Sequence, residues 1–309
     1  MPELPEVETM RRLIERELVG RTVEGIDLRL PKLMRGSPLP SLDPLIGRRL
    51  LGARRRAKVL IVDFDGDLSW IAHFKLSGQL AIEHAAGERF VAGHPVPDPS
   101  GGFPHKATHL IVRFAGGTTL FHSDIRQFGW LRLMPTSAVA ATIAAFAFGP
   151  EAVGEEAVTL PDLTTRLAKR RIAIKQALLD QGVIAGLGNI YVDEALHHAG
   201  IHPQRPANEV QPAELSRLHA SIAWSLSQGI AQGGATIIHN RAYPRDGFPQ
   251  VHGREREPCP TCATPIVKMR VGARGTYLCL TCQPQAKPPK RRAAGRASRS
   301  PQRTPTISG

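Results

Sequence analysis

Four cysteines near the C-terminal end of the chain constrain its fold more than any other feature. They form two close pairs, Cys259-x2-Cys262 and Cys279-x2-Cys282. Four soft thiolates at this spacing are typical of a tetrahedral structural zinc site, whereas two disulfides or four inert thiols are the alternatives. We therefore expect a zinc ribbon that holds one zinc ion and leaves no coordination position open for catalysis.

The charge of the chain indicates what it binds. Its 309 residues include 40 lysines and arginines against 27 acidic residues, which gives a formal net charge of +13. A field of this sign attracts an anionic polymer or an anionic membrane surface. No run of residues approaches the roughly 18 apolar residues of a membrane span, and the N-terminus lacks the basic-then-apolar pattern of a secretory signal. We expect a soluble cytoplasmic protein that binds nucleic acid.

Part of this charge lies in the last 25 residues. Residues 285–309 carry seven cations and no acid among many Pro, Ser, Ala and Gly residues, and without them the net charge is +6. Such a segment cannot bury enough apolar surface to order itself, so we predict a disordered basic tail. It is either an arm that binds phosphates without sequence preference or a solubilising extension.

The first 133 residues indicate a helix followed by strands. Apolar residues at helical spacing predict a helix from Pro5 to about Val19, which Gly20 ends. Residues 21–133 then alternate as strands do, and Ala115-Gly116-Gly117 predicts a hairpin turn. The strand-sized segments are Val23–Leu30, Lys58–Phe64, Leu68–Phe74, Leu110–Phe114 and Thr118–His122. We expect a β-sandwich or barrel with an attached helix, within a multidomain α+β protein.

The remainder of the chain, up to the cysteines, indicates helices. The predicted helical segments are Ser137–Phe148, Leu163–Leu179, Ile190–Ala199 and Ala213–Ile230. We therefore divide the chain into a β-sandwich domain at 1–135, a helical domain at 136–235, a zinc ribbon at 236–284 and the tail at 285–309.

A glycine-rich turn precedes one of these helices. Gly186 and Gly188 flank a tight connection, Asn189 is suited to cap the helix that follows, and Gly200 is suited to end it. Backbone N–H groups at such a helix start approach a phosphate closely. The alternative is an ordinary helical hairpin.

Two further positions carry reactive or charged groups. If the initiator methionine is removed, Pro2 has a free secondary amine. An α-amino group titrates near 7.7–8.0, well below a lysine amine, so a larger fraction of the Pro2 amine is neutral at physiological pH. This amine could attack a sugar C1′ atom, with Glu3 beside it to shuttle protons. Arg274, on the expected ribbon hairpin, is suited to clamp a phosphate. The alternatives are a capped helix start and a surface arginine.

Taken together, the segments resemble the formamidopyrimidine-DNA glycosylase family, bacterial base-excision enzymes related to endonuclease VIII. The resemblance covers about residues 1–284, and the opening favours the formamidopyrimidine branch. Its motifs here are PELPEVET from Pro2, RRAK ending at Lys58, DIRQFG from Asp124, GLGNIY from Gly186, GGATI from Gly233, and HGREREPC from His252.

The resemblance implies roles for individual residues. Pro2 would be the Schiff-base nucleophile, and Glu3 would be the catalytic acid and base. Lys58, which we expect on a strand, would serve β-elimination, and Arg274 would serve δ-elimination. Five more residues would contact duplex DNA or fill the gap left by an everted nucleotide: Leu76, Arg126, Phe128, Arg171 and Asn189. As residue types alone, Arg126 and Phe128 could equally be a surface cation and a core aromatic.

Three departures from the family pattern bear on DNA contacts. Leu76 stands where the family usually has methionine. Ala107 stands where the family has a histidine that contacts DNA, so His105 or His109 would have to make that contact instead. The segment Ile238–Gly253, which covers the everted base in relatives, is shorter than usual.

The resemblance thus implies a monomeric bacterial enzyme of the cytoplasm, associated with the nucleoid. It would be a bifunctional DNA glycosylase and abasic-site lyase. It would excise oxidised purines, such as 8-oxoguanine and formamidopyrimidines, through the Pro2 Schiff base and then cleave the strand by β,δ-elimination. Zinc is the only cofactor implied. The alternatives are excision of oxidised pyrimidines, as in the endonuclease VIII branch, and a non-catalytic zinc-ribbon protein that binds damaged DNA.

Overall fold

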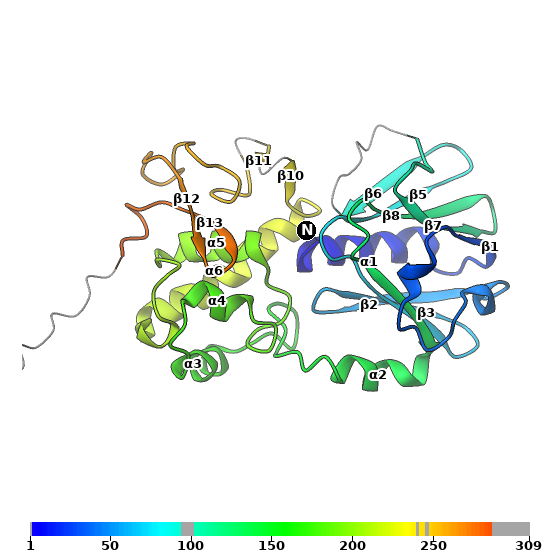
Figure 1. Ribbon diagram of the computed structural model, residues 1–309, viewed down its shortest axis with the longest axis horizontal. Coiled ribbons are helices and arrows are strands. Elements are labelled where there is room, and N and C mark those ends of the chain that lie inside the picture. Colours follow the sequence, from blue (N-terminus) through cyan, green and yellow to red (C-terminus); the bar gives the residue numbers. More distant parts are fainter. Residues whose placement is uncertain (1, 94–101, 239–240, 245–246, 286–309) are drawn as a thin grey trace, which may run out of the picture.

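The computed structural model describes residues 2–93, 102–238, 241–244 and 247–285. The predicted tail lies outside these residues apart from its first one. Figure 1 shows a β-rich lobe and a helical lobe side by side, with the N-terminus at the junction between them. Among the described residues, no helix is both long enough and apolar enough to cross a membrane.

The β-rich lobe contains two antiparallel sheets. The four-stranded sheet has the order β2 (Leu50–Arg56), β3 (Val59–Phe64), β4 (Leu68–His73) and β9 (Trp130–Pro135). The five-stranded sheet has the order β1 (Val23–Leu28), β7 (Thr108–Phe114), β8 (Thr118–Asp124), β5 (Gly78–Glu83) and β6 (Arg89–Gly93). The expected hairpin turn joins β7 and β8, where Gly116 and Gly117 have positive φ angles of 82° and 74°.

A single apolar core joins the two sheets and the first helix, α1 (Leu4–Leu18). One face of α1, including Val7, Met10 and Ile14, is fully buried in this core. Burying such side chains is the main source of stability in a sandwich of this kind. The N-terminal β-sandwich with its attached helix is therefore confirmed, and the core holds the start of α1 at the edge of the lobe (Figure 1).

Helices dominate the second lobe, which has its own apolar core. Its α-helices are α3 (Leu160–Ala168), α4 (Ile174–Leu179), α5 (Asn189–Ala199) and α6 (Pro212–Ala231). The helix α2 (Thr136–Ala144) instead packs through Val139 on the four-stranded sheet of the β-rich lobe. The short strands are β10 (Thr236–Ile238), β11 (Arg241–Tyr243), β12 (Val267–Val271) and β13 (Arg274–Leu278). Short 3-10 helices lie at Pro31–Met34 and Asp43–Leu45 in the β-rich lobe and at Ala207–Glu209 in the helical lobe. The last two strands form the hairpin of the predicted ribbon, and Gly200 ends α5 with a left-handed φ of 70°.

The expected continuous helix from Leu163 to Leu179 is wrong, because the structure breaks it between α3 and α4. The backbone there bonds to a distant segment: the Ile174 N–H donates to the Arg205 carbonyl at 2.7 Å, and the Ala207 N–H donates to the Ile172 carbonyl at 2.9 Å. Tertiary hydrogen bonds therefore override a helical pattern that residue types alone support.

Candidate active site

The first residues of the chain are enclosed at the junction of the two lobes. Pro2 and Glu3 are both buried, and the Glu3 side chain has no exposed surface. Glu3 Oε1 accepts a hydrogen bond from the Ile190 backbone N–H at 3.2 Å, in the first turn of α5. Glu3 Oε2 has no hydrogen-bond partner among the described residues. One carboxylate oxygen thus accepts a hydrogen bond from α5, and the other remains able to accept one.

Two glycines allow this close approach. The Leu4 N–H donates to the Gly186 carbonyl at 3.3 Å, and Gly186 has a positive φ of 99°. A Cβ atom at Gly188 would overlap the Glu3 carboxylate. The expectation that Asn189 caps α5 is wrong: Gly188 is the N-cap, Asn189 is the first helical residue, and Glu3 accepts the hydrogen bond a capping side chain would take.

The Gly188→Ala substitution is expected to displace Glu3 and lower the free energy of unfolding by about 1–3 kcal/mol, which is typical of overpacking a well-packed site. Gly188 has a φ of −134°, so the overlap with Glu3, and not backbone strain, is the cause. Denaturant titration measures the effect. Gly52→Ala is the matched control, because a Cβ at Gly52 meets nothing within 4 Å. Equal stability of the two variants would contradict the proposed packing.

A second buried carboxylate, Glu6, ties α1 to the helical lobe. It accepts hydrogen bonds from the Tyr191 hydroxyl at 2.6 Å and from the backbone N–H groups of Ala235 and Glu3, both at 2.7 Å. Burial, and then the neighbouring charge of Glu3, raises the pKa of Glu6 above its ordinary value. Sequence analysis did not predict this role, because the partners Tyr191 and Ala235 lie 185 and 229 residues away.

Lys58 lies in the turn between β2 and β3, not on a strand as predicted. Ala57, with a φ of 53°, reverses the chain there. Lys58 lines a cavity of about 400 Å³ at the junction of the lobes, together with Gly188 and Asn189. Burial lowers the pKa of the Lys58 amine, although the carboxylate of Glu3 acts in the opposite direction. A lysine with a lowered pKa carries a neutral amine more readily, which suits proton abstraction.

The predicted gap-filling residues lie on neighbouring turns of the sandwich. Leu76 and Phe128 line the same cavity, and Phe128 is 54% exposed, so it is not a core aromatic. The Arg126 guanidinium lies 5.2 Å from the centre of the Phe128 ring. Buried Asp124 accepts hydrogen bonds from the Ser77 hydroxyl and from the Arg126 backbone N–H, which joins the two turns. Leu76, Arg126 and Phe128 therefore lie on two joined turns beside the cavity.

The ribbon hairpin places Arg274 in the wall of the cavity, opposite the turns of the sandwich. The next residue is held firmly: the Gly275 carbonyl accepts hydrogen bonds from Asn189 Nδ2 at 2.9 Å and from Lys175 Nζ at 3.1 Å. Lys175 is fully buried and forms an ion pair with Asp193 at 2.6 Å. Asn189 Oδ1 has no partner among the described residues. The hairpin is thus fixed to α4 and α5, with Arg274 exposed.

The four cysteines meet as a zinc site requires. Their Sγ atoms all lie within 4.8 Å of one another, with distances of 3.8 Å between Cys259 and Cys282 and 3.4 Å between Cys262 and Cys279. A tetrahedron with zinc–sulfur bonds of 2.3 Å has edges of about 3.8 Å. The donor set fits one structural zinc ion.

Other predicted residues lie away from the cavity. Arg171 is exposed in the connection between α3 and α4 and does not line the cavity. His109 is buried and bonds to the Asp124 carbonyl at 2.8 Å, and half-buried His105 lies near Ser123. Neither histidine lines the cavity. His73, which sequence analysis missed, does line it, and burial lowers its pKa to about 3, so it is neutral.

Comparison with known proteins gives a consistent result along the chain. Residues 1–131 match the formamidopyrimidine-DNA glycosylase N-terminal domain, 148–240 match the H2TH domain of the same glycosylase, and 256–285 match a zinc finger found in FPG and IleRS. A formamidopyrimidine-DNA glycosylase of Streptococcus thermophilus is 38% identical over 288 residues, which cover 92% of this chain and 99% of the relative. The chain belongs to the formamidopyrimidine-DNA glycosylase family. A relative of the same name from Bacillus subtilis is 36% identical over 92% of this chain and 99% of its own length.

Solved structures of the family agree. A complex of a Lactococcus lactis Fpg variant with DNA containing Fapy-dG has a TM-score of 0.78 and 34% identity, covering 92% of this chain and all of the other. A complex of the Lactococcus lactis enzyme with DNA containing an abasic site has the same TM-score, at 32% identity and the same coverage. The fold and the membership of the formamidopyrimidine-DNA glycosylase family are therefore confirmed, as is a four-cysteine zinc-finger site suited to one structural zinc ion. The two related enzymes were solved in complex with DNA that contains Fapy-dG or an abasic site.

Proposed function

We propose that this glycosylase excises oxidised purines by attack of the Pro2 amine on the C1′ atom of an everted nucleotide. The observation that carries this proposal is the packing of Glu3, the neighbour of buried Pro2, against Gly188. Gly188 lines the cavity that Lys58 and Arg274 also line. The relatives named above are formamidopyrimidine-DNA glycosylases, which favours this branch over an endonuclease VIII-like preference for oxidised pyrimidines.

The chemistry proceeds in balanced steps. The neutral Pro2 nitrogen forms a bond to C1′, and the damaged base leaves with the glycosidic electron pair and takes up a proton. Glu3, through the oxygen that has no hydrogen-bond partner in the described part of the chain, delivers and accepts the protons near this nitrogen. The nitrogen then loses its proton and its electron pair opens the sugar ring: the C1′–O4′ bond breaks, O4′ takes up a proton, and a cationic iminium remains at C1′. The iminium makes the C2′ proton acidic, and loss of this proton expels the 3′ phosphate. A second elimination expels the 5′ phosphate.

Other cavity residues serve these steps. Lys58 removes the C2′ proton and contacts phosphate, and Arg274 holds the phosphate that leaves in the second elimination, in the fork geometry that guanidinium offers. Asn189 and Arg171 bind the DNA backbone. Leu76, Arg126 and Phe128 enter the space that the everted nucleotide leaves, which offsets part of the cost of eversion.

Phe128→Ala is expected to slow excision from duplex DNA by roughly 10-fold or more, because the exposed ring no longer fills the vacated stack and eversion costs a few kcal/mol. Single-turnover excision from duplex and from single-stranded lesion DNA measures the effect. A single strand needs no wedge, so its excision rate stays unchanged. Ile125→Ala, at an exposed residue three positions earlier, is the control. Equal losses on both substrates would contradict the wedge.

A panel of duplexes tests the function as a whole. We expect excision of 8-oxoguanine opposite cytosine and of formamidopyrimidines, with phosphates at both ends of the resulting gap, and much slower excision of thymine glycol. Preference for thymine glycol would place the enzyme functionally with endonuclease VIII. Lesion binding with no strand cleavage would indicate a non-catalytic protein.

The proposal extends to organisation and location. We predict four parts of the chain: the β-sandwich domain at 1–135, the helical domain at 136–235, the zinc ribbon at 236–284 and the basic tail at 285–309. We also predict that the protein is a monomer. The named relatives are bacterial, and genomic DNA is the substrate, so we place the enzyme in the bacterial cytoplasm with the nucleoid.

A further inference from the structure

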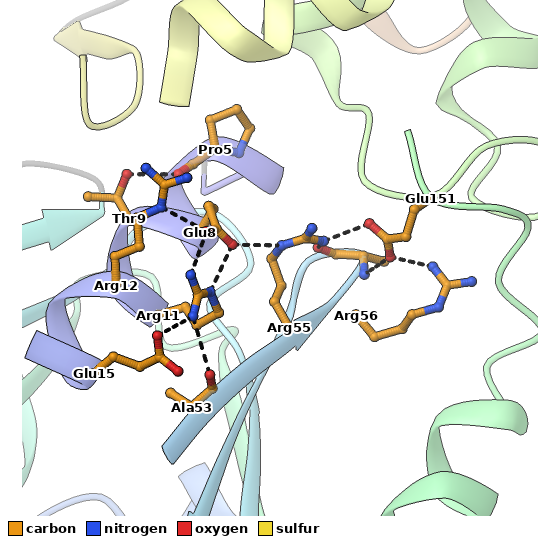
Figure 2. Close-up of polar contacts among 11 residues, drawn as sticks. Pro5, Glu8, Thr9, Arg11, Arg12, Glu15, Ala53, Arg55, Arg56 and Glu151 are labelled. Atoms are coloured by element: carbon orange, nitrogen blue, oxygen red, sulfur yellow. Dashed lines mark hydrogen bonds and ion pairs between the residues drawn. The ribbon is translucent and has the colours of Figure 1, made fainter. Parts of the chain in front are cut away.

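The two arginines just before the Lys58 turn bind a single glutamate on the connection between the lobes (Figure 2). Arg55 Nη1 lies 2.8 Å from Glu151 Oε2, and Arg56 Nη1 forms an ion pair with Glu151 Oε1. Glu151 Oε1 also accepts a hydrogen bond from the Ala57 backbone N–H at 2.6 Å. The Glu151 side chain is only 12% exposed. These arginines are therefore engaged within the protein, and the carboxylate holds the backbone beside Lys58.

The turn itself needs such support. Ala57 has a left-handed φ of 53°, which a residue with a Cβ atom rarely adopts. Its carbonyl accepts a hydrogen bond from Arg55 Nη1 at 2.7 Å. Charge-assisted hydrogen bonds of this kind are stronger than neutral ones. With both its N–H and its carbonyl bonded to charged side chains, the residue before Lys58 is held in one conformation.

Glu151 is equally well anchored on the side of the helical lobe. Its two flanking residues pair with the strand-like segment that leads into the glycine-rich turn: the Ala185 N–H donates to the Pro150 carbonyl at 2.8 Å, and the Ala152 N–H to the Ala185 carbonyl at 3.1 Å. Ala185 directly precedes Gly186, against which the start of α1 packs. Glu151 thus joins the two sides of the cavity, one carrying Lys58 and the other carrying the turn that holds Glu3.

A second carboxylate completes the cluster from α1. Glu8 Oε2 lies 3.5 Å from Arg55 Nε, and Glu8 also bonds to Arg11 and Arg12 (Figure 2). Burial alone would raise the pKa of Glu8, but the hydrogen bonds from Arg11 and Arg12 bring it below its ordinary value. Glu8 is therefore charged at neutral pH. Arg55 is held between α1, whose N-cap is Glu3, and the connection that carries Glu151.

Resting on the function proposed above, we propose that Glu151 is a positioning residue for Lys58. Its carboxylate sets the Ala57–Lys58 turn against the glycine-rich turn and so fixes the distance between the Lys58 amine and the C2′ proton of the iminium. Glu151 does not touch DNA or Pro2 in this role. Its loss therefore affects elimination and spares formation of the covalent adduct.

Glu151→Ala tests this proposal on the full-length protein. We expect the single-turnover rate of β-elimination at a preformed abasic site to fall by about 10- to 100-fold, since misplacement of a catalytic group by about 1 Å costs this much. Borohydride trapping of the Pro2 adduct should stay within about threefold of wild type, because the proposal leaves attack at C1′ unaffected. Glu15→Ala is the matched control: it removes another carboxylate of the cluster, bonded to Arg11, that does not touch the Lys58 turn.

Two further variants separate positioning from general damage to the fold. Glu151→Gln keeps an oxygen to accept the Ala57 N–H, so it should restore much of the elimination rate, and it serves if Glu151→Ala fails to fold. In a Lys58→Ala background, adding Glu151→Ala should cause no further loss, because Glu151 acts through Lys58. Additive losses, or equal falls in trapping and elimination, would overturn the proposal.

The outcome for wild type keeps the two proposals apart. If wild type traps no adduct on any lesion or abasic duplex, the function proposed above fails. If wild type traps and cleaves normally and Glu151→Ala cleaves at the same rate, only the role of Glu151 fails.

Discussion

Glu3→Gln is expected to reduce the rate of base excision by roughly a hundredfold to ten-thousandfold, the range typical of a lost general acid or base. Glutamine has the same shape and keeps an oxygen that accepts the Ile190 N–H, so the fold at the junction should survive. Glutamine lacks a titratable oxygen at the position of Glu3 Oε2, which accepts no hydrogen bond from any residue that the structure describes. The side chain would no longer deliver a proton as the base departs.

Two measurements make this expectation specific. Single-turnover excision of 8-oxoguanine reports the loss, whereas cleavage at a preformed abasic site, which has no base left to expel, should fall much less. Glu24→Gln, which changes an exposed carboxylate on β1, should leave both rates unchanged. An excision rate for Glu3→Gln within a few-fold of wild type would remove Glu3 from the mechanism.

Loss of zinc is the second change with a large expected effect. Structural zinc contributes about 10–16 kcal/mol to folding in small zinc modules, and the apolar core of this ribbon is small: Val251, Cys259, Ile266, Tyr277 and Cys279. Without the metal the hairpin β12–β13 should unfold. Arg274 would then leave the cavity wall, and Lys175 and Asn189 would lose the Gly275 carbonyl that both bind.

We expect Cys262→Ser to lower zinc content well below one ion per chain and to weaken binding to an uncleavable abasic duplex by roughly 100-fold or more. The β-rich lobe should stay folded, because it has its own core. Metal analysis, fluorescence anisotropy and circular dichroism measure the three effects. Leu280→Ala, an exposed residue beside Cys279, is the control that leaves every thiolate in place. A zinc-free protein with unchanged affinity would contradict the structural role of the ribbon.

The parts of the site that sequence analysis predicted share a local signal. The cysteine pairs, the glycines of the GLGN turn and the hairpin that carries Arg274 all depend on residues close together in the chain. Each of these residue types has few alternative roles at its spacing. Paired thiolates at this spacing bind a metal, and glycines occur where another segment of backbone or side chain must approach closely. The structure brings the four thiolates together, forms the hairpin that carries Arg274, and places Gly188 in contact with Glu3.

The parts that it missed depend on contacts between distant segments. Glu6 bonds to Tyr191, and Glu151 bonds to the turn before Lys58, across 185 and 94 residues. Lys175 and Asp193 form a fully buried ion pair behind Arg274, although lysine and aspartate are usually exposed in proteins. In each case the residue type indicates a surface position, and only the tertiary fold supplies a partner. The break between α3 and α4 has the same origin.

The central claim is that the Pro2 nitrogen attacks C1′, and mapping the reduced covalent complex tests it most directly. Protein lacking Met1 is mixed with abasic duplex, reduced with borohydride, digested and analysed by mass spectrometry. The account predicts that the sugar remnant is attached to Pro2, and that it is absent from protein in which Met1 is retained. Attachment to a lysine such as Lys58, or efficient strand cleavage without any adduct, would contradict it.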